Sequence, residues 1–134
     1  MAIPSGARMI EPVQEDFDEL FAELRPLIER HASALEVVRD EPGDFQVQST
    51  KAGPSGTHMW FGAVQTRKSH VSVHVMPAYS HPDVMEGVSD DLRARMQGRS
   101  CFNFTPKTAT PELLDELSQV IERGLERYRA DGLA

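Results

Sequence analysis

A strict alternation of valine with polar residues near the middle of the chain is the feature that most constrains its fold. In the run Ser69-His-Val-Ser-Val-His-Val-Met76, three valines occupy every second position. Successive side chains of a strand point to opposite faces, so this run predicts a strand with a valine face and a histidine face. We expect the valine face to pack against the core and the face of His70 and His74 to be only partly covered.

The residues before this run predict the partner strand of a hairpin. Residues 58–66 are rich in aromatic and β-branched side chains, and a short turn at Arg67-Lys68 follows them. With a two-residue turn, Trp60, Gly62 and Val64 are expected on the valine face. The residues expected beside the histidines are Met59, Phe61, Ala63 and Gln65.

Three further strands are predicted around this hairpin. Residues 35–39 and 45–49 are predicted strands on either side of a turn at 40–44, which contains Pro and Gly. Residues 51–56 are expected to form a flexible loop because they include Gly, Pro and Ser. A short final strand is predicted at 101–104.

Two apolar stripes at helical spacing predict long helices near the ends of the sequence. Pro12 suits the first position of the first helix, and Pro26 inside it predicts a kink or a separate last turn. Thr110 and Pro111 favour the start of the second helix, and Gly132 favours its end. The first stripe contains Val13, Phe17, Leu20, Phe21, Leu24 and Ile28, and the second contains Leu113, Leu114, Leu117, Val120, Ile121, Leu125 and Tyr128.

Together these elements predict an α+β fold. We expect a two-layer sandwich in which an antiparallel β-meander sheet is covered on its valine face by the N- and C-terminal helices. The crossover of residues 77–100 contains a short predicted helix at 90–97, between an N-cap at Ser89 and Gly98. A chain of 134 residues has the size of one domain, which we place at 11–134 after a flexible segment at 1–10.

Charge and composition argue against several kinds of partner. A formal net charge of -7 repels phosphate backbones and anionic lipid surfaces, so we expect neither nucleic acid nor a membrane as partner. The first residues lack the apolar core of a signal peptide, and no apolar run approaches the ~20 residues of a membrane span. Cys101 is the only cysteine, so no intramolecular disulfide can form, and we expect a cytoplasmic location.

An acidic stretch without any Lys or Arg covers residues 11–23. Glu15, Glu19 and Glu23 stand four residues apart, so they line one ridge of the predicted helix. Carboxylate oxygens bind hard cations, which makes this ridge a candidate metal site. The alternative is a solvated face whose acids favour the helix N-terminus. The remaining acids of the stretch are Glu11, Asp16 and Asp18.

The spacing of the histidines argues against a metal site formed by histidine side chains. His70 and His74 share a predicted face but are ~13 Å apart along the strand, too far for one ion. His58 and His81 have no partner nearby in the sequence. We interpret His70 and His74 as polar members of a partly covered face.

The most unusual segment is the basic run of residues 93–99, which holds three arginines in an otherwise acidic chain. Arginine presents planar donors, so the segment predicts contact with a carboxylate or phosphate group of a small ligand. The alternative is a capped helix and an edge strand whose arginines pair with nearby acids. Cys101 is a candidate nucleophile only if a neighbouring cation lowers its pKa, and a small packed residue is the alternative.

Two segments carry a resemblance to a known family. Residues 74–79 (HVMPAY) and 92–104 (LRARMQGRSCFNF) resemble the YdhG-like bacterial proteins of unknown function, which are grouped by fold with the bacterial frataxin CyaY. The similarity extends over about residues 17–128. It implies an α-β-sheet-α sandwich and an iron-chaperone role, with iron on the acidic first helix. The residues that match by position are Glu15, Asp18, Glu19 and Glu23.

No phosphate-binding loop, nucleophile elbow or metalloprotease motif is present in the sequence. Our leading hypothesis is therefore a non-enzymatic module that binds a small molecule or a protein on the histidine face, under a roof formed by residues 77–103. That face is also a candidate homodimer surface. Weak iron binding and a cysteine-dependent enzyme are the alternatives. The predicted ligand-binding residues are His74, Met76, Tyr79, Arg95, Arg99, Ser100, Cys101 and Asn103.

Overall fold

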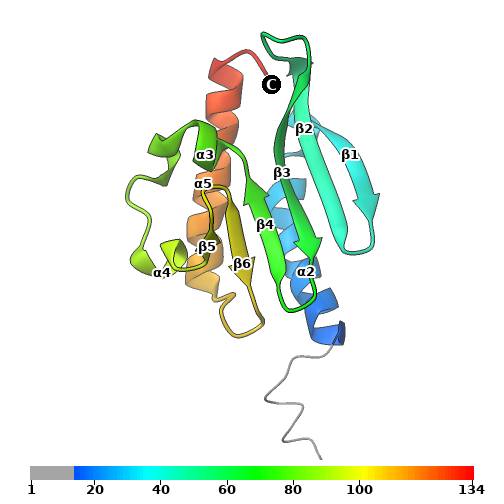
Figure 1. Cartoon of the computed structure of the whole chain (residues 1–134), viewed down its shortest axis with the longest axis vertical. Coiled ribbons are helices and arrows are strands. Elements are labelled where there is room, and N and C mark those ends of the chain that lie inside the picture. Colours follow the sequence, from blue (N-terminus) through cyan, green and yellow to red (C-terminus); the bar gives the residue numbers. More distant parts are fainter. Residues whose placement is uncertain (1–13) are drawn as a thin grey trace, which may run out of the picture.

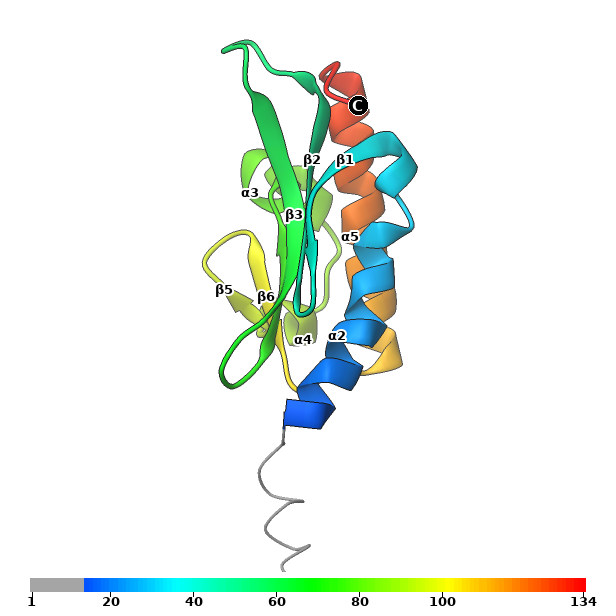
Figure 2. The same cartoon turned by 90° about the vertical axis from the view of Figure 1, so that its right-hand side faces the viewer.

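Within residues 14–134, which the computed structural model describes, a six-stranded antiparallel sheet forms one layer and two long helices form the other (Figures 1 and 2). The strands lie in the order β1-β2-β3-β4-β6-β5. The strands are β1 (Leu35–Glu41), β2 (Asp44–Ala52), β3 (His58–Thr66), β4 (Val71–Val75), β5 (Met96–Gln97) and β6 (Cys101–Phe104). The helical elements are α2 (Gln14–Glu29), η1 (Ala32–Ala34), α3 (Pro77–Ser80), η2 (Pro82–Met85), α4 (Asp90–Arg93) and α5 (Pro111–Ala130).

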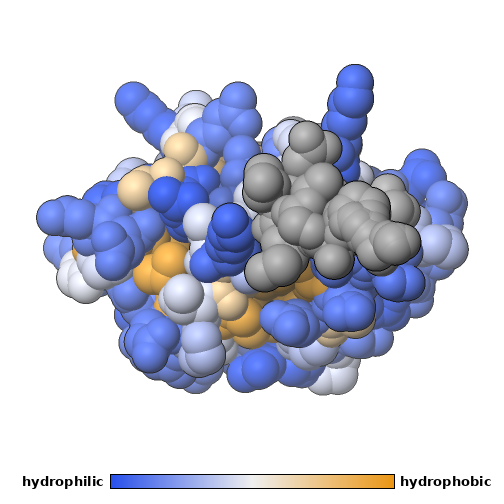
Figure 3. Space-filling model, turned by 90° about the horizontal axis from the view of Figure 1, so that it is seen from below, coloured by the Kyte–Doolittle hydropathy of each residue, from blue (hydrophilic) through white to orange (hydrophobic). Residues whose placement is uncertain are grey.

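The two long helices cover the valine face of the sheet, as predicted. Figure 2 shows α2 and α5 on the same side of the strands. Val71, Val73 and Val75 are fully buried, and they belong to one core with apolar residues of both helices. The end-on view of Figure 3 shows hydrophobic surface in patches between hydrophilic side chains. The predicted two-layer α+β sandwich is therefore confirmed.

The start of the chain lies outside the described residues. The predicted flexible segment at 1–10, the helix start at Pro12 and the side chains of Glu11 and Val13 all belong to that part. The described part of α2 does not break at Pro26, because the helix continues to Glu29. Pro26 has no N–H to donate to the carbonyl one turn earlier in the helix. Because Pro26 is exposed, water can donate to that carbonyl instead.

The β3–β4 hairpin has a turn one residue later than predicted. The Arg67 N–H donates to the carbonyl of His70 (2.8 Å), and Lys68 and Ser69 lie between them. Val64 consequently pairs with Val73, two residues further along β4 than a turn at 67–68 requires. Because side chains alternate with a period of two, this shift leaves Val64 on the valine face.

A β-bulge in β3 reverses the predicted faces of Trp60 and Phe61. Val47 of β2 pairs with Gly62 and Gln48 pairs with Trp60, so Phe61 is an extra residue in β3. Phe61 is fully buried and packs edge-to-face on Tyr128 of α5, with 5.2 Å between ring centroids. Trp60 instead lies beside His74, so the prediction for these two residues is wrong.

The crossover between β4 and β6 packs along α5. α3, η2 and α4 all contact α5, and none of them forms the predicted roof over the histidine face (Figure 1). Gly124 of α5 makes the contact with α3 possible, since a Cβ at this position would lie 2.8 Å from the Cβ of Pro77. The predicted roof is therefore wrong, because the apolar side of the crossover is buried in the helical layer.

The segment before β6 combines a confirmed and a wrong prediction. The Ser89 side chain caps α4 by accepting a hydrogen bond from the Leu92 N–H (3.2 Å), as predicted. α4 ends at Arg93 and not at Gln97, because Met96 and Gln97 pair with β6 as the edge strand β5. The tight turn that follows needs a positive φ, which Gly98 supplies at 76°.

Candidate functional site

The face of the sheet opposite α2 and α5 is lined by two rows of residues that pair directly across the strands, and we call it the open face. Residues that pair directly across antiparallel strands point to the same side. Figure 1 shows this side of β2, β3, β4 and β6 in front of the helices. One row is Gln46, Ala63, His74, Cys101 and Gln97, and the other is Asp44, Gln65, Ser72 and Asn103.

Hydrogen bonds connect the polar side chains at the β4–β6 end of the open face. The Asn103 Oδ1 accepts from the Ser72 hydroxyl (2.9 Å) and from the Cys101 thiol (3.2 Å). The Asn103 amide nitrogen donates to Gln97 Oε1 (3.0 Å). Ser72 is only 2% exposed, so this network is held in a fixed geometry by buried strand residues.

A second network lies at the β2–β3 end of the open face. Asp44 Oδ1 accepts from Gln46 (3.0 Å) and from Gln65 (3.1 Å). Gln65 Oε1 accepts in turn from Arg67 Nη2 (2.6 Å). These contacts fix the amides and hold the guanidinium of Arg67, which comes from the β3–β4 turn, against this face.

An aromatic pair stands between the two networks. The rings of Trp60 and His74 have centroids 5.3 Å apart at an angle of 47°. The indole nitrogen of Trp60 and the Nε2 of His74 are both enclosed, and neither has a hydrogen-bond partner among the described residues. Burial lowers the pKa of His74 and the charge of Arg67 adds to this effect, so the imidazole is neutral at pH 7. The centre of the open face thus holds two polar atoms whose hydrogen bonding is unsatisfied.

The environment of Cys101 does not activate its thiol. Burial raises the pKa of the Cys101 thiol, and this effect outweighs the opposing effects of the Ser72 hydroxyl and the Arg67 charge. A nucleophilic cysteine needs a lowered pKa, because the thiolate is the reactive form. The geometry therefore gives no support to the alternative of a cysteine-dependent enzyme.

The eight predicted ligand-binding residues do not form one site. His74, Cys101 and Asn103 share the open face, as expected from their alternation. Tyr79 and Arg99 line a cavity at the β5 edge, while Arg95 lines another cavity beside the start of α5. The remaining two residues lie at the end of β4, where Met76 precedes α3 and the Ser100 carbonyl accepts from the Val75 N–H.

Sequence reasoning missed four contributors to the open face: Trp60, Arg67, Ser72 and Gln97. The alternation of β4 placed Ser72 on the correct face, but a serine without a visible partner gave no reason to choose it. Trp60 was missed because the face on which it lies depends on the bulge at Phe61, and no residue type in β3 indicates that bulge.

The acidic ridge of α2 remains solvent-exposed. Glu15, Asp18, Glu19 and Glu23 are all exposed. Among residues 14–134, no group of three or more His, Cys, Asp or Glu side chains is arranged to hold a metal ion. Iron binding at this ridge therefore stays a prediction that rests on the family resemblance.

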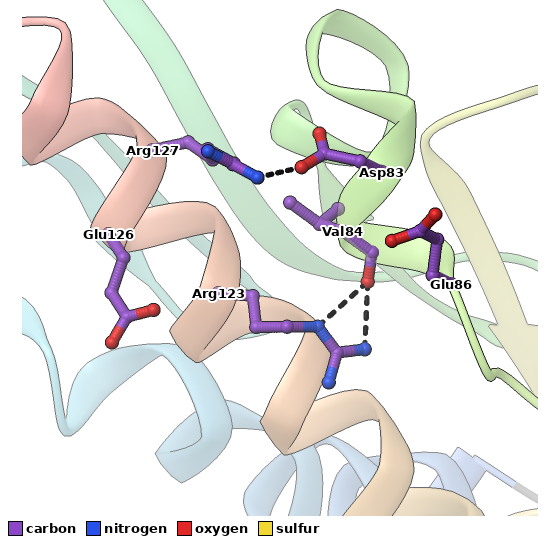
Figure 4. A pocket seen from close by; sticks show the side chains of 6 residues that line it. All are labelled: Asp83, Val84, Glu86, Arg123, Glu126 and Arg127. Carbon is purple, nitrogen blue, oxygen red and sulfur yellow. Dashed lines mark hydrogen bonds and ion pairs between the residues drawn. The ribbon is translucent and has the colours of Figure 1, made fainter.

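A cavity of about 290 Å³ between η2 and α5 has a structural explanation (Figure 4). Arg127 of α5 forms an ion pair with Asp83. Arg123 donates two hydrogen bonds, of 3.0 and 2.8 Å, to the carbonyl of Val84. Both arginines are thus engaged in holding η2 against α5, and we assign this cavity no ligand.

Within the described residues, no helix is long and apolar enough to cross a membrane.

The resemblance to the YdhG-like and frataxin-like proteins stays a prediction. Comparison of the chain with known protein families, with curated proteins and with solved structures finds no match.

Proposed function

We propose that this domain is a non-enzymatic binding module and that its ligand, a small molecule or a protein, docks on the open face around Trp60 and His74. The observation that carries the proposal is the pair of enclosed ring nitrogens at the centre of this face, which have no hydrogen-bond partner within residues 14–134. An unpaired buried polar group costs about 1–3 kcal/mol. Both nitrogens are enclosed, so a ligand recovers that cost by displacing the side chains that cover one of them and hydrogen-bonding to it.

The surroundings of the aromatic pair support recognition of a polar ligand. The flanking amides of Gln65, Gln97 and Asn103 are positioned by hydrogen bonds, so they present their remaining donors and acceptors without further ordering. Arg67 is exposed and adds a cation at the rim. The raised pKa of the Cys101 thiol does not support a nucleophilic role for this residue on the open face.

The single tryptophan of the chain makes this proposal directly testable. In a ¹H–¹⁵N spectrum, one indole N–H signal reports on Trp60 alone. We expect members of a library of small polar and aromatic compounds to shift this signal. Affinity for these compounds is expected to fall about tenfold or more in His74→Ala, because one hydrogen bond between uncharged groups and one ring contact are lost.

Tyr79→Ala is the matched control, since Tyr79 is exposed and lies in a separate cavity. This variant is expected to bind the same compounds with unchanged affinity. The proposal is wrong if bound compounds leave the Trp60 signal in place, or if His74→Ala binds them as tightly as the wild type.

A second copy of the chain is one possible protein partner, and the same signal identifies it. If the open face is a dimer surface, the Trp60 indole signal shifts with protein concentration and the sedimentation coefficient rises in parallel. If both stay constant over the concentration series, the partner is not a second copy.

A further inference from the structure

A cavity of about 400 Å³ opens at the β5 edge of the sheet, away from the open face. Its walls come from α3, η2, the end of α4 and the β5–β6 turn. This volume falls in the range of small-molecule sites, which are about 300–1,000 Å³. The lining residues that carry the argument are Ala78, Tyr79, Met85, Arg93, Met96 and Arg99. We call this space the edge cavity.

The inner part of the edge cavity is apolar. Ala78 and Met85 are 5% and 6% exposed, and Met96 is half-buried against the core. Tyr79 at the mouth is 56% exposed, which is unusual for a ring of this size. Methionine side chains adapt to the shape of a ligand, and a tyrosine ring offers a flat apolar surface at low entropic cost.

One cationic side chain at the rim of the edge cavity has no partner within residues 14–134. Arg93 donates from its Nη2 to the carbonyl of Met85 (2.8 Å), so its guanidinium is fixed at the wall. Arg99 is exposed and forms no hydrogen bond or ion pair with any residue in 14–134. Among the lining residues that the structure describes, Glu86 is the single carboxylate, so they carry a net charge of one positive unit in a chain whose total charge is -7.

We infer that the edge cavity binds a small monocarboxylate with an apolar or aromatic body. The free guanidinium of Arg99 matches a carboxylate in geometry, because both groups are planar and can form two parallel hydrogen bonds. The body then contacts Met85 and Met96 below the ring of Tyr79. A phosphate monoester fits less well, since its two negative charges exceed the local positive charge and lie close to Glu86.

This inference does not depend on the open face. None of the residues that carry it belongs to the two cross-strand rows, and Trp60 and His74 do not line the edge cavity. Each site can therefore fail without the other, and their reporter groups differ: the Trp60 indole for the open face and the methionine methyl groups for the edge cavity.

The test uses 3-phenylpropionate as the probe and protein labelled with ¹³C at its methionine methyl groups. We expect 3-phenylpropionate to shift the methyl signals of Met85 and Met96 and to leave the Trp60 indole signal in place. A fragment of this size binds with a Kd on the order of millimolar. Arg99→Gln is expected to weaken binding about tenfold or more, because a charge-assisted pair of hydrogen bonds is lost.

Arg95→Gln is the matched control, since it makes the same charge change four residues away in a different cavity. It is expected to bind the probe like the wild type. The uncharged 3-phenylpropionamide and the dianion phenyl phosphate are both expected to bind at least about tenfold more weakly. The inference is overturned if the amide equals the acid, if Arg95→Gln weakens binding as much as Arg99→Gln, or if the two methyl signals do not move.

Discussion

The two faces of this sheet are built from the same strands and differ in what covers them. Along β4, Val71, Val73 and Val75 face the helices and are fully buried, whereas His74 between them is half-buried beside Trp60. The covered face is apolar and closed by α2 and α5, while the open face is polar and cross-linked by hydrogen bonds. Burial on one side stabilises the fold, and the other side is the one on which we propose that a ligand binds.

The largest expected contrast comes from two neighbours on opposite faces. Phe61→Ala should lower the free energy of unfolding by about 3–5 kcal/mol, because it leaves a cavity against Tyr128. Trp60→Ala should cost only about 1–2 kcal/mol, since Trp60 is only partly buried. Urea denaturation of both variants checks the contrast. Equal costs would mean that the bulge does not place the two rings on different sides.

A second test concerns the contact between α5 and the crossover. Gly124→Ala places a Cβ 2.8 Å from Pro77, and overpacking of this kind costs about 1–3 kcal/mol. The gain of about 1 kcal/mol in helix propensity offsets part of that cost. We expect a net loss of about 1 kcal/mol by thermal denaturation. Glu122→Ala, at an exposed position of the same helix, is the control and should change stability little. A stabilised Gly124→Ala would show that the crossover is free to move.

Two buried serines, one on each face of the sheet, provide a third comparison. Ser49 accepts from the Met59 N–H (2.9 Å) and donates to the Lys51 carbonyl (2.6 Å), so Ser49→Ala removes a hydrogen-bond partner from each of two backbone groups. We expect a cost of about 1–3 kcal/mol. Ser72→Ala should cost less, about 1 kcal/mol, because the Asn103 Oδ1 keeps its contact with Cys101. Chemical denaturation ranks the two variants, and the reverse order would contradict this account.

The sequence was sufficient for features that depend on local periodicity. The valine alternation identified the covered face, and the apolar stripes identified both long helices. The extra residue at Phe61 was not predictable, because a bulge is a property of the pairing between β2 and β3 and not of either strand alone.

Prediction of the candidate site depended more on tertiary contacts than prediction of the fold did. Alternation correctly grouped His74, Cys101 and Asn103, since direct cross-strand pairing follows from register. Arg95 and Arg99 separate because Met96 and Gln97 form an edge strand between them, followed by the turn at Gly98. The side on which the crossover packs depends on contacts between residues far apart in the sequence, such as Pro77 with Gly124 and Val84 with Arg123.

The smallest expected effect is the pH dependence contributed by His74. Its pKa is lowered from the ordinary value of 6.5 in the folded protein, so the unfolded chain binds the proton more readily as the pH falls. The stabilising contribution is therefore complete above pH 6.5 and is lost as the pH falls through the lowered pKa. In denaturation series from about pH 7.5 to about pH 5, His74→Gln should lose slightly less stability than the wild type.

The variant His31→Gln distinguishes a pH response of the open face from a pH response elsewhere in the molecule. Burial lowers its pKa in the same direction, but it lies between α2 and β1, so His31→Gln removes a similar pH dependence without touching the open face. Only protonation of His74 should quench the fluorescence of Trp60, because the two rings are in contact. A wild-type quenching transition with a midpoint below pH 6.5 that persists in His31→Gln and disappears in His74→Gln would link the pH response to the open face. If it survives in His74→Gln, another group controls the environment of Trp60.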